Sequence, residues 1–220
     1  MKPLFNTFFI ATATIYVAVC GATSRADAEE WRFAVSLDGK PIGYHHFRLQ
    51  EDGTQRELKS DARFDVKFLF FNAYRYEHHD REVWRDDCVT QIAAHTDVNG
   101  VRKVVNGAQD AEQFRLNTEE RSANLEHCVM TFAYWNPRIL SASRLLNPQT
   151  GEYVPVKVSR VGTDTIAVRG RQQSAVHYRI ESEPTAAEPL AIDLWYSSAN
   201  EWLALKSLTE GGRHLEYRLQ

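Results

Sequence analysis

The chain has 220 residues, of which 43% are hydrophobic, and its 26 lysines and arginines against 29 aspartates and glutamates give a net charge of −3 at neutral pH. This length suits one domain with a full hydrophobic core, or at most two small domains. No block of basic residues is present, which argues against nucleic acid and anionic membrane surfaces as partners.

The first 28 residues have the order of a secretory signal peptide. Lys2 precedes an almost wholly apolar run over residues 8–22, and the small side chains of Ala26 and Ala28 occupy the two positions that a signal peptidase reads before the expected cleavage after Ala28. The run is about 15 residues long, shorter than the roughly 20 that a transmembrane helix needs. Lipidation at Cys20 is the alternative, but Val19 before it does not suit lipoprotein processing. We therefore expect an exported protein, periplasmic or secreted, without a transmembrane segment after cleavage.

Two cysteines, Cys88 and Cys128, remain after this cleavage. In an oxidising compartment they allow a single intramolecular pairing, and we expect a disulfide between them. The alternative is two buried thiols on separate strands.

From Trp31 onward the sequence alternates apolar and polar residues, which is typical of strands with one buried face. Asp38-Gly39 and Asn99-Gly100 predict tight hairpin turns. The predicted strands cover residues 31–37, 42–50, a long segment ending at 84, 89–95, 153–160, 165–169, 175–180, 191–196, 203–209 and 215–219.

One segment predicts a helix, over residues 137–146. Asn136 suits the N-cap, Pro137 suits the first position, and Asn147-Pro148 ends it. The predicted fold class is therefore all-β with minor α. It is a curved antiparallel sheet that forms a half-barrel or barrel, in a single β-rich domain of residues 29–220.

Residues 74–88 contain two histidines between acidic residues. As a strand they divide into one face with Tyr74, Tyr76, His78, Asp80, Glu82 and Trp84 and another with the intervening, mainly charged residues. His78 and His79 then point apart, so two histidines of this strand do not share a metal. A metal site of His46, His78 and Asp80 across strands is one alternative. A polar network in which Asp80 or Glu82 bonds a histidine or tyrosine is the preferred interpretation. We expect His46 and His78 on the concave side, with pKa values lowered by burial.

No nucleophile elbow, zinc-protease motif, phosphate-binding loop or dinucleotide-binding motif is present in the sequence. We therefore assign no catalytic residue, no metal ligand and no cofactor. Aromatic residues of both parities crowd residues 64–74, so this strand is either covered on both sides or lines an apolar pocket on one side.

Several segments of the chain resemble an uncharacterised family of exported bacterial proteins known only as a domain of unknown function. They are VSLDGKPIGYHHFRL (35–49), REVWRDDCV (81–89), HTDVNG (95–100), LLNPQTGEYVPV (145–156) and IDLWYSSANEWLALKS (192–207). The ending, with its LWY strand and final LEYRL strand, is also similar to periplasmic carriers of the lipoprotein-localisation type. That similarity implies a curved antiparallel sheet around an apolar cavity for acyl chains, although this chain has fewer helices to fill it.

The leading hypothesis is a non-enzymatic periplasmic protein that binds or carries a lipid-like or other apolar ligand. Its expected ligand-binding residues are Phe68, Phe70, Tyr74, Tyr76, His46, His78 and Trp84. One alternative is an envelope protein that pairs with other proteins through a sheet edge or through Trp135–Pro137. The other is a hydrolase or metal-binding protein that uses scattered histidines and acids.

Overall fold

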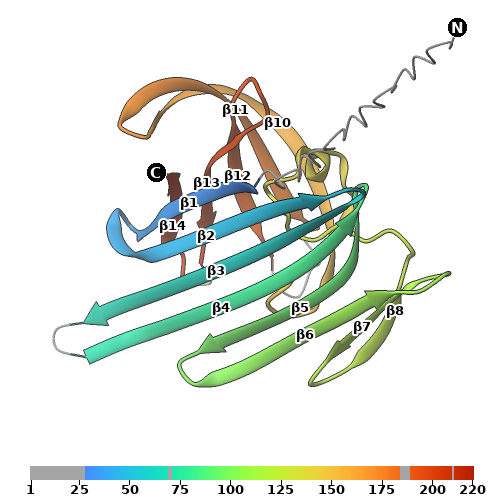
Figure 1. The fold of residues 1–220 in the computed structure, drawn as a ribbon. Helices are drawn as coiled ribbons and strands as arrows, with labels where there is room; N and C mark the ends of the chain where they lie inside the picture. The colour runs from blue at the N-terminus through green and yellow to red at the C-terminus, as the bar shows by residue number, and fades with distance from the viewer. Residues whose placement is uncertain (1–27, 69–70, 184–188, 210) are drawn as a thin grey trace, which may run out of the picture.

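The computed structural model describes residues 28–68, 71–183, 189–209 and 211–220, and almost all of them lie in antiparallel strands (Figure 1). Cys20 and Phe70 lie outside these ranges, and the predicted cleavage site after Ala28 lies at the start of the first one. The strands are β1 Ala28–Leu37, β2 Lys40–Asp52, β3 Gln55–Phe68, β4 Phe71–Arg85, β5 Cys88–Val98, β6 Val101–Gln109, β7 Phe114–Thr118, β8 Ser122–Leu125, β9 Arg144–Leu146, β10 Tyr153–Val168, β11 Arg171–Ser182, β12 Ala191–Tyr196, β13 Trp202–Leu208 and β14 His214–Leu219.

All of these strands belong to one 14-stranded sheet in the order β8-β7-β6-β5-β4-β3-β2-β1-β14-β13-β12-β11-β10-β9. Each neighbour in this order is also a neighbour along the chain, except for β1 and β14, which pair from Phe33↔Leu219 to Leu37↔Leu215. The sheet curls, so that β10 to β14 lie above and behind β1 to β3 in Figure 1. Strands β8 and β9 end the sheet without pairing with each other. The curved antiparallel sheet is thus confirmed, and it is open rather than closed.

The hairpin turns follow the sequence signals. Asp38, Gly39, Asn99 and Gly100 all have positive φ angles, as two-residue turns of the I′ kind require. Glycine has a different role at Gly43 in β2, where an added Cβ would lie 1.9 Å from the backbone oxygen of Arg63 in β3. Strands β2 and β3 therefore approach closely at a point where only glycine fits.

The predicted helix is correct at its start and wrong in its length. Asn136 accepts a hydrogen bond from the Arg138 backbone N–H, and Pro137 opens a 3₁₀ helix, η1, that ends at Ser141. The last three residues of the predicted helix, Arg144–Leu146, form β9, which pairs with β10. The separation of the predicted strands 153–160 and 165–169 is also wrong, because Gly162 between them lies at a bulge inside the single long strand β10. No helix within the described ranges is long and apolar enough to cross a membrane.

The segment between β8 and β9 is tied to the sheet at its start. Cys88 and Cys128 form the predicted disulfide, and the Val89 backbone N–H donates to the Val129 carbonyl at 2.9 Å. Further along, Tyr134 packs against Trp202 of β13, with 5.1 Å between ring centroids. This segment therefore fills part of the space inside the curled sheet.

The main aromatic cluster of the core lies where the two ends of the chain meet. Phe33 of β1 is 4.1 Å from the Trp202 ring, and Phe47 of β2 is 5.2 Å from the same ring. Trp202 is 1% exposed and Phe33 is equally buried. Burial of such large side chains stabilises the β1–β14 junction.

Candidate ligand-binding cavity

Strand β4 divides its side chains between two faces as the sequence predicts. Tyr76, His78, Asp80, Glu82 and Trp84 are buried, while the charged residues between them from Arg75 to Arg81 are largely exposed. The alternation breaks at Val83, which is also buried, because the pairing with β5 shifts register between Val83 and Trp84. The inner face of β4 therefore places two carboxyl groups and a histidine inside the molecule.

These groups line an interior cavity of about 990 Å³. One part of its wall is polar and comes from β2, β3, β4 and the segment after the disulfide: His45, Ser60, His78, Asp80, Glu82 and Thr131. The other part includes the apolar residues Phe47, Leu58, Phe132, Val154, Leu190, Ile192, Leu205, Leu208 and Leu215, together with the polar residues Asn147, Gln149, Glu152, Ser207 and Thr209. The volume lies at the upper end of the roughly 300–1,000 Å³ range of small-molecule sites.

Two histidines stand at the polar wall, with 6.3 Å between their ring centroids. His45 Nε2 is 2.8 Å from Ser60 Oγ, and His78 Nδ1 is 2.9 Å from Thr96 Oγ1. Burial lowers the pKa of both rings, to about 4 for His78, with a smaller contribution from neighbouring histidines. Both imidazoles are therefore neutral at neutral pH.

Asp80 and Glu82 form a buried carboxyl pair with a hydrogen bond between their side chains. Glu82 is 1% exposed and accepts hydrogen bonds from the Trp84 indole at 2.9 Å and from Thr131. Burial raises the pKa of Glu82 to about 7, and burial together with the adjacent Glu82 raises the pKa of Asp80 well above its ordinary value. The pair therefore retains a proton at neutral pH.

The predicted polar network inside the sheet is present, although its partners differ from those expected. The carboxyl groups bond to each other, to an indole and to a hydroxyl, and the histidines bond to hydroxyls. Ser60 with a neutral His45 has the geometry of a nucleophile and a base. The other ring nitrogen of His45 faces the Tyr217 hydroxyl at 3.4 Å, whereas a catalytic triad has a carboxylate there.

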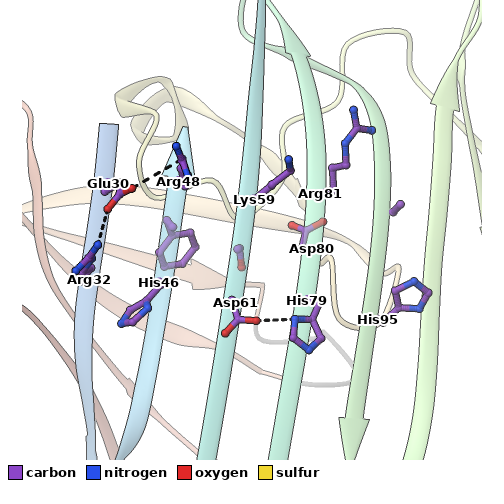
Figure 2. A pocket seen from close by; sticks show the side chains of 13 residues that line it. Glu30, Arg32, His46, Arg48, Lys59, Asp61, His79, Asp80, Arg81 and His95 are labelled. Carbon is purple, nitrogen blue, oxygen red and sulfur yellow. Dashed lines mark hydrogen bonds and ion pairs between the residues drawn. The ribbon is translucent and has the colours of Figure 1, made fainter. Parts of the chain in front are cut away.

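His46 lies on the opposite face of the sheet, and its predicted position beside His78 is wrong. It is exposed and belongs to a row of residues at directly paired positions on neighbouring strands (Figure 2). The row runs from Arg32 on β1 through His46, Asp61 and His79 to His95 on β5. Within this row the His79 ring is 2.7 Å from the Asp61 carboxylate. The considered metal site of His46, His78 and Asp80 therefore does not form, and no group of three potential metal ligands occurs among the described residues.

The remaining predicted ligand-binding residues lie outside the cavity lining or outside the described side chains. Tyr76 stacks on Phe64, with 4.9 Å between centroids, and Tyr74 packs partly buried next to Tyr76. Trp84 is fully buried and packs edge-on against Trp135. Phe68 ends β3 with a side chain outside the described set, and Phe70 is outside altogether. Of the seven predicted residues, only His78 lies among the described residues that line the cavity.

His45 is the residue that sequence reasoning missed, although a signal for it was present. Phe47 and Leu49 are buried in β2, and His45 shares their parity, so the alternation places it inside. Ser60 and Tyr217 likewise share the parity of apolar residues in their strands, whereas Thr131 lies outside the strands and carries no such signal. Which of these residues meet depends on strand register and on the path of the segment after Cys128. Trp135, considered as an anchor for a partner protein, is buried against Trp84.

Comparison with known proteins identifies the family but no activity. A family model described as a domain of unknown function (DUF6134) matches residues 33–220. The chain belongs to this family. No curated protein matches the sequence. A crystal structure of a beta-barrel-like protein of domain of unknown function DUF1849 from Brucella abortus is similar, with a TM-score of 0.65 over 89% of this chain and 96% of that chain. At 8% identity the two share a fold. Membership of an uncharacterised family is thus confirmed.

Proposed function

We propose that the protein is a non-enzymatic, exported binding or carrier protein that holds an amphipathic, lipid-like molecule in its interior cavity. The observation that carries this proposal is the lining of the cavity, which is mainly apolar along β12, β13 and β14 and carries the polar groups of His45, Ser60, His78, Asp80 and Glu82 along β2, β3 and β4. A molecule with an apolar chain and a polar head matches both parts of such a wall. The expected signal peptide agrees with a role in the periplasm or outside the cell.

Binding is favoured over hydrolysis by the surroundings of the Ser60–His45 pair. His45 lacks a carboxylate at its second nitrogen, and its neighbour Tyr217 is a neutral phenol whose pKa burial raises. The cavity also extends well beyond this pair, to Leu190, Leu208 and Leu215 on the other wall. These features support a site for a polar head group and an apolar chain better than a positioned catalytic triad.

A bulky side chain in the cavity tests the proposal. Ser207 of β13 lines the cavity and shares the parity of Leu205, so Ser207→Trp should fill it. We expect this variant to bind N-phenyl-1-naphthylamine, an apolar fluorophore, about tenfold more weakly than the wild type, as measured by fluorescence titration. Native mass spectrometry of exported protein should show a small amphipathic molecule that the variant lacks.

Ser174→Trp is the matched control, because Ser174 is exposed on β11 and lies outside the cavity lining. It should bind the fluorophore as the wild type does. Equal binding by both variants would place the fluorophore elsewhere on the surface and contradict the proposal.

A further inference from the structure

The charge of the cavity wall restricts the chemistry of its ligand. Three acidic residues, Asp80, Glu82 and Glu152, line the cavity, and no lysine or arginine does so among the described residues. The two histidines that line it, His45 and His78, are neutral at neutral pH because burial lowers their pKa values. The wall therefore holds acidic groups without a counter-cation.

One carboxyl oxygen in this wall has no hydrogen-bond partner. Asp80 is 7% exposed, and its Oδ1 atom is buried without a partner among the described residues. Buried carboxyl oxygens are normally hydrogen-bonded, since leaving one unpaired costs free energy. Across the sheet, the Ser60 hydroxyl contacts His45 Nε2 at 2.8 Å and Ala94 has no polar side chain, so neither neighbour is hydrogen-bonded to Asp80 Oδ1.

Three aromatic rings also line the cavity. Phe47, Tyr134 and Tyr217 line it, and the phenol groups of both tyrosines are neutral because burial raises their pKa values. The faces of aromatic rings attract cations and accommodate alkyl groups. An anionic head group, in contrast, would meet acidic side chains here and, among the residues that the structure describes, no lysine or arginine.

We propose that the ligand is a cationic amphiphile, an alkyl chain with an amine head group that the carboxyl groups of Asp80 and Glu82 bind. This inference rests on the proposed binding function and specifies the class of its ligand. The ammonium N–H groups donate to Asp80 Oδ1 and to the shared carboxyl oxygens, and the alkyl chain lies along Leu205 and Leu215. The head group replaces the proton that the pair holds, and that proton passes to solvent, so the charge of the cavity is conserved.

Three amphiphiles with one chain length test the inference: decylamine, decanoate and decanol. By isothermal titration calorimetry at neutral pH, we expect the wild type to bind decylamine at least about tenfold more tightly than decanoate, with decanol between them. Titrations in two buffers of different ionisation enthalpy should show proton release with decylamine alone. Asp80→Asn removes the ionisable carboxyl group that binds the ammonium and should abolish the preference for decylamine over decanol and decanoate.

Asp61→Asn is the matched control, because Asp61 lies on β3 beside the same strand but on the exposed outer face, and it should retain the preference. Thermal melts of each variant report folding, and Glu82→Gln serves as a second variant if Asp80→Asn does not fold. Decanoate binding as tight as decylamine, or an unchanged preference in Asp80→Asn, would overturn the inference and leave the binding function standing. Failure of all three amphiphiles to bind would instead contradict the proposed function itself.

Discussion

At the scale of single residues, burial acts in opposite directions on the two kinds of titratable group inside the sheet. It lowers the pKa of His45 and His78, as expected for His78, and it raises the pKa of Asp80 and Glu82. Tyr134, Tyr217 and Glu152 also line the cavity. Both kinds of interior group are therefore in their neutral form over part of the range between pH 4 and pH 7.

These shifts predict a pH dependence of stability that single substitutions reveal. The pKa of His78 falls from 6.5 to about 4 on folding, so the unfolded state binds more protons than the folded state. Acidification below pH 6.5 therefore destabilises the fold, by about 2 kcal/mol at pH 5. The pKa of Glu82 rises from 4.5 to about 7, so the folded state binds more protons. Its contribution is present below pH 4.5 and is lost as pH rises through about 7.

We expect the two contributions to offset each other in the wild type. Denaturant unfolding at about pH 5 and pH 7.5 should show that His78→Gln gains stability at the lower pH relative to the higher, and that Glu82→Gln does the opposite. The same pH profile in wild type and His78→Gln would mean that His78 is solvated in both states.

At the scale of single elements, the close approach of β2 and β3 depends on one glycine. Gly43 has φ of +156°, and a Cβ there would overlap the Arg63 backbone. Gly43→Ala should therefore destabilise the protein by about 3 kcal/mol, a value typical of strained backbone and steric overlap. Gly162→Ala is the control, since it has open space around the added carbon and lies at a bulge of β10. Equal denaturation midpoints for the two variants would show that β2 can move away from β3.

The disulfide holds the segment that completes the cavity. It joins residues 40 positions apart, so its loss should destabilise the fold by about 4 kcal/mol in the chain-entropy model. Thr131, Phe132 and Trp135 follow Cys128 and line the cavity. Replacing both cysteines by serine should lower the free energy of unfolding by this amount and weaken fluorophore binding more than Ser174→Trp does. Unchanged binding would show that the segment keeps its place without the bond.

At the scale of the whole molecule, the repeated alternation of the sequence predicts the sheet and its curvature well. Turn residues such as Asn99 and Gly100 locate hairpins because their backbone angles are specific to them. The pairing of β1 with β14 does not follow from the sequence pattern, since no local sequence signal links Phe33 with Leu219. The candidate site depends on such pairings. The alternation along β4 predicts that His78 faces the interior, but it does not predict which residues of the other strands lie beside it.

The pairing of β1 with β14 also governs how the chain reaches its native state. Every other strand pair in the sheet is a neighbour along the chain, so it forms by local zipping at a small loop-closure cost. The junction between Phe33 and Leu219 instead requires nearly the whole chain to be present. During synthesis β1 exists long before β14, and it carries an unpaired edge with Trp31, Phe33 and Val35 on one side. The strand order of this sheet therefore leaves the β1 edge unpaired and prone to aggregation until β14 has been synthesised. A chaperone has most effect during this interval.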